Sequence, residues 1–169
     1  MIAIIPLTSS WKKDREEENA ALALAKDTEK NGTEESVHWF KQTIGNACGS
    51  YALIHTVLNG PAKDHIVPNS TFSNILAAST NSPASSASMA ERAKILYDNL
   101  ELEIAHQEAA QRGDSETPEV DEQGRHVGMH FVAFVKEGGI LWELEGCELL
   151  VFLLVYSSWN SLFLHLCAS

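Results

Sequence analysis

Apolar runs and the polar breaks between them divide the first part of the chain into three predicted elements. Residues 1–5 are apolar and are followed by a proline, a pattern typical of a short buried strand. Residues 11–30 are rich in strong helix formers and lead into an Asn-Gly pair, so we expect a helix that ends there. The short aromatic stretch at residues 37–40 is expected to be extended.

The central part of the chain predicts three helices. Asn46 can cap a helix over residues 47–58, which an Asn-Gly-Pro sequence terminates. Side chains recur at helical spacing along it, so one of its faces should be buried. That face consists of Tyr51, Ile54, His55 and Leu58. Shorter helices are expected within residues 69–81 and over residues 88–99.

The last part of the chain changes from helical to strand-like patterns. Residues 106–128 have no strong periodicity and contain several charges, which predicts a long exposed loop. Apolar runs at 129–135 and 140–144 flank a Glu-Gly-Gly turn and predict a β-hairpin. Residues 149–155 are apolar, but polar side chains soon interrupt this tail. We therefore expect a packed element there rather than a membrane span, which needs about 20 mostly apolar residues.

Length and composition narrow the class of protein. The chain has 169 residues, which suits one domain, and its hydrophobic fraction of 44% can supply a core. A formal net charge of -11 argues against sequence-independent nucleic-acid binding and favours a partner with a basic face. The sequence contains neither a phosphate-binding Gly-rich motif nor a Gly-x-Ser-x-Gly motif, so nucleotide binding and serine hydrolysis are not supported.

The cysteines indicate catalysis or packing rather than cross-linking. Cys48, Cys147 and Cys167 are too few and too scattered for a disulfide framework or a four-ligand zinc site. No basic segment followed by an apolar run opens the chain, so we expect no secretory signal and a reducing cytosol. Because the cysteines lack the number and spacing of a zinc site, the sequence predicts no bound metal.

Cys48 is the candidate nucleophile, because it begins a predicted helix. The N–H groups and partial positive charge of a helix N-terminus favour the thiolate over the thiol. Gln42 precedes it by six residues, and an amide in such a place can donate to an oxyanion beside the backbone N–H of the nucleophile. The alternatives are an inert, half-buried cysteine and a solvent-facing polar glutamine.

His130 is the candidate base, at the start of the first hairpin strand. If the turn holds two or four residues, Phe131 lies opposite Gly146 and Val132 opposite Glu145. His130 and Glu145 then share one face as diagonal neighbours, about 7–8 Å apart at the backbone. The carboxylate can then orient the imidazole through Nδ1. A loop one residue longer would put the two on opposite faces, and a lone histidine is otherwise a core residue.

Two segments resemble a known family. Gln-Thr-Ile-Gly-Asn-Ala-Cys-Gly at 42–49, followed by Leu-Ile-His at 53–55, resembles the active-site segment of the ubiquitin carboxyl-terminal hydrolase (UCH) thiol peptidases. Gly-Met-His-Phe-Val-Ala-Phe at 128–134 and Leu-Trp-Glu-Leu-Glu-Gly at 141–146 resemble the histidine and carboxylate segments of that family. The segments follow one another in the expected order and spacing.

The resemblance implies an α+β fold of the papain-like UCH type, with a mostly antiparallel central sheet flanked by helices. It implies a deubiquitinating thiol hydrolase that cleaves the bond after the C-terminal glycine of ubiquitin. Cys48 would attack the carbonyl, His130 would act as base and then as acid, and Gln42 would stabilise the oxyanion. Glu145 would orient His130. No cofactor is implied.

The same resemblance gives expectations about partners. Ubiquitin and its adducts are the implied partners. Residues 106–127 resemble the loop that crosses the active site and restricts the leaving group to small or flexible adducts. Apart from the resemblance, the lack of targeting signals favours the cytoplasm, with nuclear entry permitted by size. We expect a monomer with neither a nucleic-acid nor a membrane partner.

The sequence departs from the family pattern in three places. Glu145 stands where the family has Asp, one methylene shorter, and a catalytic group misplaced by about 1 Å can cost ~10²-fold in rate. If the shorter carboxylate fits better, Asp at this position should leave activity equal or higher. Family segments that precede the point matching Met1 have no counterpart, and residues 147–169 match nothing expected.

We therefore expect a partial UCH-like catalytic domain over residues 1–146 and a divergent apolar tail over 147–169. We hypothesise that this sequence comes from a partial or mis-spliced gene model. An uninterrupted transcript in this reading frame would count against this hypothesis. Two alternatives to the enzyme remain. One is a catalytically impaired ubiquitin-binding remnant, and the other is a papain-like acyl-transfer enzyme with another substrate.

Overall fold

The computed structural model describes residues 1–26, 37–81, 86–114, 128–146 and 152–154. Within these residues the chain forms five α-helices, one 3-10 helix and four strands. In chain order they are β1 (Ile2–Pro6), α1 (Ser9–Lys26), α2 (Cys48–Val57), η2 (Gly60–His65), α3 (Thr71–Thr80), α4 (Ser86–Tyr97), α5 (Leu100–Arg112), β2 (Met129–Glu137), β3 (Ile140–Leu144) and β4 (Phe152–Leu154).

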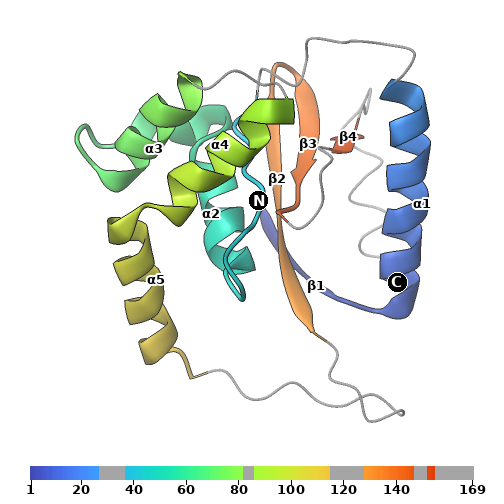
Figure 1. Ribbon diagram of the computed structural model, residues 1–169, viewed down its shortest axis with the longest axis horizontal. Helices are drawn as coiled ribbons and strands as arrows, with labels where there is room; N and C mark the ends of the chain where they lie inside the picture. Colours follow the sequence, from blue (N-terminus) through green and yellow to red (C-terminus); the bar gives the residue numbers. More distant parts are fainter. Residues whose placement is uncertain (27–36, 82–85, 115–127, 147–151, 155–169) are drawn as a thin grey trace.

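The four strands form one antiparallel sheet in the order β1-β2-β3-β4, so the predicted α+β fold with an antiparallel sheet is confirmed. Helix α1 lies on one side of this sheet, and the group formed by α2, α3, α4 and α5 lies on the other (Figure 1). The helices therefore flank the sheet on both sides, as expected from the sequence.

The hairpin of β2 and β3 has the register that the sequence predicts. Ala133 pairs with Leu144, and Glu137 pairs with Ile140. The turn between the strands contains Gly138 and Gly139, whose φ angles of 60° and 81° lie in the left-handed region. Two consecutive positive φ angles give the tight turn whose twist matches that of the strands, and glycine adopts them without strain.

The register gives β2 two faces with different neighbours. Ala133 and Val135 belong to a buried apolar cluster shared with Trp142 of β3 and Ala52 of α2. The alternate residues of β2, His130 among them, point to the opposite face, because successive side chains in a strand alternate. The alternation thus separates the apolar contact with α2 from the face that carries the histidine.

A second apolar cluster joins the helices on the α2 side of the sheet. The predicted buried face of α2 is confirmed, since Tyr51, Ile54 and Leu58 lie in this cluster and His55 is fully buried. Helices α3 and α4 contribute, among others, Ile75 and Leu96. Helix α2 is therefore buried between the sheet and the other helices, which fixes the position of its N-terminus.

Two predicted elements need correction. The strand at the start of the chain exists, but it is an edge strand rather than a buried one, with Ile4 54% exposed. The predicted loop over 106–128 is wrong as far as residue 112, because α5 continues to that point. Its Ala-, Glu- and Gln-rich sequence has high helix propensity, and the Asn99 side chain caps it by accepting from Leu102 N–H. Residues 115–127 lie outside the described part.

Other boundaries differ by a few residues. The predicted helix over 11–30 begins at Ser9 and is described as far as Lys26. The helix expected over 88–99 begins at Ser86 and ends at Tyr97. The stretch at 37–40 has neither helix nor strand.

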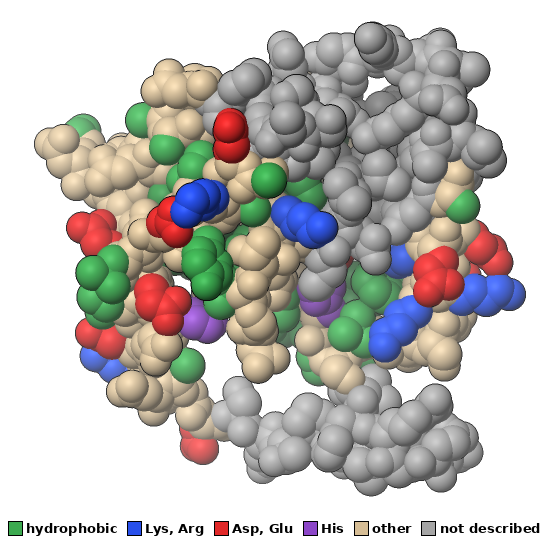
Figure 2. All heavy atoms as spheres, viewed as in Figure 1, with side chains coloured by type: hydrophobic (Ala, Val, Ile, Leu, Met, Phe, Trp, Pro, Cys, Tyr) green, Lys and Arg blue, Asp and Glu red, His purple; other side chains and the backbone are tan. Residues whose placement is uncertain are grey.

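Two further observations concern the surface and the helices of the described residues. Acidic and basic side chains are interspersed with hydrophobic ones over the described part of the visible face (Figure 2). None of the helices in the described residues combines the length and apolar character that crossing a bilayer requires.

Candidate active site

Cys48 is the first residue of α2, but the side-chain cap that the sequence predicts for this helix does not form. Asn46 does not cap the helix. It has a φ of 58°, in the left-handed region that asparagine tolerates better than most residues, and Ala47 occupies the cap position without a side-chain hydrogen bond. The first turn of α2 therefore presents backbone N–H groups that no Ala47 side chain caps.

Cys48 and His130 are brought together from positions 82 residues apart (130 − 48). A hydrogen bond from His130 lowers the pKa of the Cys48 thiol, against the opposing effect of burial. Backbone hydrogen bonds at Phe131 and Gly49 lower it further. The same contact with Cys48, and then the contact with Glu145, raise the pKa of His130 to about 9. Both shifts favour a thiolate beside an imidazolium, which is the reactive form of a cysteine nucleophile.

Glu145 lies against the other side of the imidazole. Its Oε1 is 2.5 Å from Nε2 of His130, and both side chains are buried. The predicted neighbourhood is therefore correct, but the predicted use of Nδ1 is wrong. Because the carboxylate takes Nε2, Nδ1 is the ring nitrogen that remains for the thiol of Cys48. Glu145 follows directly after the end of β3, and Trp39 Nε1 donates to its backbone carbonyl at 2.8 Å.

Gln42 lies in the segment that passes beside the end of the hairpin. Its backbone N–H donates to the carbonyl of Gly146 at 2.6 Å, and its side-chain Nε2 donates to the carbonyl of Ile44 at 2.9 Å. A Cβ at residue 146 would lie 3.0 Å from the Gln42 Cβ, so glycine permits this close approach. Gln42 is thus held next to the residue that follows Glu145.

Two buried polar residues of the α2 region support this segment in a way that was not predicted from the sequence. His55 Nε2 accepts from the backbone N–H of Phe40 at 3.0 Å. The Asn59 side chain accepts from the backbone N–H of His38 and donates to its carbonyl. Burial lowers the pKa of His55 to about 4, so its ring is neutral near neutral pH. A signal existed for His55, since it is the one polar residue on the predicted buried face.

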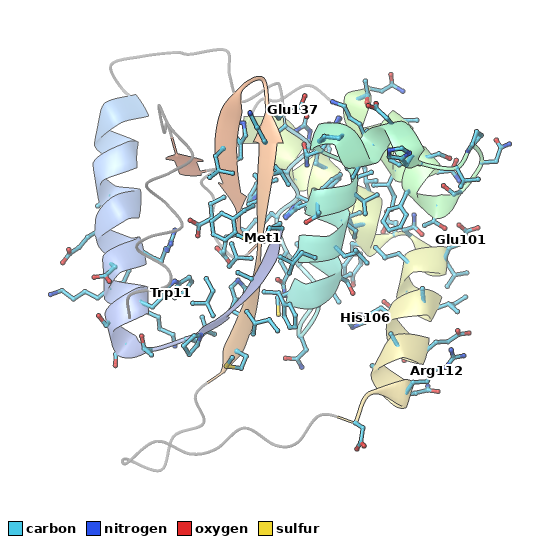
Figure 3. All side chains as sticks on the ribbon, turned by 180° about the vertical axis from the view of Figure 1, so that it is seen from behind. Met1, Trp11, Glu101, His106, Arg112 and Glu137 are labelled. Carbon is cyan, nitrogen blue, oxygen red and sulfur yellow. The ribbon has the colours of Figure 1, made fainter. Side chains whose placement is uncertain are left out.

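The face of the sheet opposite α2 carries a contact that the sequence did not predict. The ring of Trp11, in the first turns of α1, lies 6.1 Å from the ring of His130, measured between centroids. Figure 3 shows Trp11 near the start of α1, on the side of the helix toward the sheet. No periodicity or motif connects residues so far apart in the sequence.

The set of donors suits acid–base and nucleophilic chemistry. Among the residues that the structure describes, no group of three or more His, Cys, Asp or Glu side chains could hold a metal ion. A thiol in contact with an imidazole, which in turn contacts a carboxylate, supplies the three components of nucleophilic acyl transfer.

Comparison with known proteins agrees with this arrangement. The family model described as "Ubiquitin carboxyl-terminal hydrolase, family 1" matches residues 1–155. The chain belongs to this UCH family. It is therefore a member of a family of thiol peptidases, as the resemblance implied.

Relatives with assigned names give the same family. A probable ubiquitin carboxyl-terminal hydrolase of Dictyostelium discoideum is 36% identical over 148 residues, which cover 86% of this chain and 52% of the relative. Ubiquitin carboxyl-terminal hydrolase isozyme L1 of Rattus norvegicus is 31% identical over 146 residues, covering 86% of this chain and 58% of the relative. The chain thus spans about half the length of these relatives.

A solved UCH structure has a similar fold. The catalytic domain of Trichinella spiralis UCH37, bound to ubiquitin vinyl methyl ester, matches with a TM-score of 0.56 and 18% sequence identity. The match covers 82% of this chain and 57% of the UCH37 chain. The family match also continues nine residues past Gly146, to residue 155, and this stretch includes β4, which pairs with β3. The division into a domain over 1–146 and a tail over 147–169 stays a prediction.

Proposed function

We propose that this chain is a cysteine-type deubiquitinase domain that hydrolyses the bond after the C-terminal glycine of ubiquitin. The observation that carries the proposal is the contact of Cys48 with His130 and of His130 with Glu145. The first contact joins α2 to β2 across 82 residues (130 − 48), and both contacts shift pKa values toward the thiolate and imidazolium. The UCH family gives the substrate class.

In the proposed reaction, the thiolate of Cys48 attacks the carbonyl carbon of the terminal glycine and forms a C–S bond. The carbonyl π electrons move to oxygen. His130 then gives its proton to the leaving amine as the C–N bond breaks, which leaves a thioester on Cys48. A water molecule attacks the thioester, His130 takes its proton, and the C–S bond breaks to release the carboxylate of ubiquitin.

The oxyanion of each tetrahedral intermediate needs donors. The backbone N–H groups at the start of α2 are candidates, since Ala47 provides no side-chain cap there. Gln42 is the side-chain candidate. Its Nε2 donates to the carbonyl of Ile44, and the proposal requires the amide to donate to the oxyanion during the reaction.

Substrate selection is proposed on two grounds. The net charge of -11 suits the basic face and the arginine-containing tail of ubiquitin. The stretch after α5 resembles the loop that in this family limits the leaving group to small or flexible adducts. We further propose a cytoplasmic enzyme, with nuclear entry permitted by its size.

A ubiquitin C-terminal vinyl methyl ester tests the proposal. The chain should form a covalent adduct at Cys48 that disappears in Cys48→Ala. With a fluorogenic ubiquitin amide, Gln42→Ala should lower kcat by about 10²-fold at equal folding, and an unchanged kcat would remove its role in oxyanion stabilisation. Glu108→Ala, an exposed change on α5, is the control.

The alternative of a non-catalytic ubiquitin-binding remnant is favoured by one observation, Glu145 in the place where the family has Asp. It predicts tight non-covalent ubiquitin binding without an adduct at Cys48. Turnover of another ester or amide, with indifference to ubiquitin, would instead indicate a different papain-like activity. Each result excludes the proposed deubiquitinase.

A further inference from the structure

The contact between Trp11 and His130 joins α1 to the candidate base. The two rings are 6.1 Å apart between centroids, with an angle of 52° between their planes. Trp11 is half-buried and His130 is buried. Cys48 and Glu145 contact the ring nitrogens of His130, so Trp11 is a third neighbour that approaches the ring from a different element.

Trp11 is itself held in place by Arg15 of the same helix. The guanidinium of Arg15 lies over its ring, 5.3 Å from the ring centroid. Arg15 Nη2 lies 2.9 Å from Oε1 of Glu143, and these two side chains are 17% and 6% exposed. Glu143 is on β3, two residues before Glu145, so α1 is attached to the strand that positions the carboxylate partner of His130.

We propose that Trp11 is a positioning residue for His130 and that the Arg15–Glu143 ion pair holds Trp11 in that role. Two hydrogen bonds can define the plane of an imidazole only while the side chain stays in one rotamer. An aromatic ring beside it fills the space into which the imidazole would otherwise swing, and it attracts the protonated ring through its π electrons. The inference rests on the proposed function only in assuming that His130 acts as a base.

Alkylation of Cys48 by iodoacetamide tests the proposal without ubiquitin. The rate near neutral pH reports the thiolate, which His130 stabilises, and mass spectrometry of the peptide that contains Cys48 separates it from the other cysteines. Trp11→Ala should slow this alkylation about tenfold, which corresponds to about 1.4 kcal/mol. Trp11→Phe, which keeps an aromatic ring, should restore most of the rate. Lys12→Ala, an exposed change on the same helix, should leave it unchanged.

Turnover of a fluorogenic ubiquitin amide gives the second measurement, normalised to the number of active sites. Trp11→Ala should lower kcat about tenfold with little change in KM, because the lost interaction acts on the base rather than on substrate binding. A merely structural role would lower the number of active sites and leave kcat per site unchanged. Arg15→Ala should also lower kcat, but it should add little to Trp11→Ala, because both changes remove the same support.

Trp11→Leu serves if Trp11→Ala does not fold, since it keeps apolar volume without an aromatic ring. Unchanged alkylation and kcat per site in the folded variant would overturn the proposal. If wild type alkylates in a Trp11-dependent manner but forms no ubiquitin adduct, the positioning role stands and the proposed deubiquitinase fails. If wild type forms the adduct and the Trp11 variants behave as wild type, the proposed deubiquitinase stands and the positioning role of Trp11 fails.

Discussion

Replacing Glu145 by Asp tests whether the carboxylate of this chain is matched to its own backbone. The resemblance to the family, which has Asp here, led to the expectation of equal or higher activity if the shorter carboxylate fits better. The geometry reverses that expectation. Glu145 Oε1 already lies 2.5 Å from Nε2 of His130, so no shorter side chain is needed to bring the groups together.

The size of the effect follows from bond lengths. Removing one methylene withdraws the carboxylate by up to about 1.5 Å, to about 4 Å from Nε2, whereas an N–H···O hydrogen bond needs about 2.7–3.2 Å. A catalytic group displaced by about 1 Å can cost roughly 10²-fold, equal to about 2.7 kcal/mol of transition-state stabilisation. Since Glu145 also helps to raise the pKa of His130 to about 9, the alkaline limit of activity should move toward neutral by about one pH unit.

The assay is turnover of a fluorogenic ubiquitin amide from about pH 5 to about pH 10, with kcat and KM determined separately. Glu145→Gln has the length of Glu without its charge, so it separates the two effects. Glu137→Asp makes the same chemical change at the far end of the hairpin, where the carboxylate binds Gly60 and Lys63, and it should leave kcat unchanged. A Glu145→Asp variant that is as active as wild type over this pH range would refute the reasoning.

Three further outcomes are expected. The pH dependence of kcat/KM should be bell-shaped, with an acidic limit below the ordinary thiol range, because His130 lowers the pKa of Cys48, and an alkaline limit near pH 9 from His130 itself. Burial lowers the pKa of His55 from 6.5 to about 4, so below pH 6.5 the unfolded chain binds the extra proton more readily and stability falls with the pH. When the pH is lowered from 6.5 to about 4, the free energy of unfolding of wild type, measured with urea, should fall by up to about 3 kcal/mol more than that of His55→Gln. Gly60→Ala should lower the free energy of unfolding by about 1–2 kcal/mol, because Gly60 has a φ of 60° and an added Cβ would lie 3.0 Å from a β2 carbonyl oxygen. Gly45→Ala, with nothing within 4 Å of the added Cβ, is the matched control in the same urea measurement.

The parts of the site that follow from local rules could be predicted from the sequence. The Glu-Gly-Gly turn fixed the hairpin register, and the register placed His130 and Glu145 on one face. Helical spacing indicated the buried face of α2, and the predicted helix placed Cys48 at its first turn. These features depend on residues close in the sequence, where propensity and turn chemistry dominate.

The rest depends on packing between distant elements. The choice of Nε2 over Nδ1 on His130 is set by the side from which Cys48 approaches, which the hairpin alone does not determine. The exposure of β1 follows from its place at the edge of the sheet, which an apolar sequence does not reveal. Trp11 could not be connected with His130, because α1 has no pairing rule that orients it against the sheet.

Glu145 shows why a departure from the family pattern cannot be judged from side-chain length alone. Its backbone is held by the indole of Trp39, which donates to its carbonyl, and the next residue is held by the backbone N–H of Gln42. The segment that contains Trp39 and Gln42 is in turn attached to α2 through His55, which accepts from Phe40. The helix that carries the thiol and the residue that carries the carboxylate, just after β3, are therefore tied to the same segment. The distance that a carboxylate must span to His130 is a property of that assembly, and in this chain a glutamate spans it.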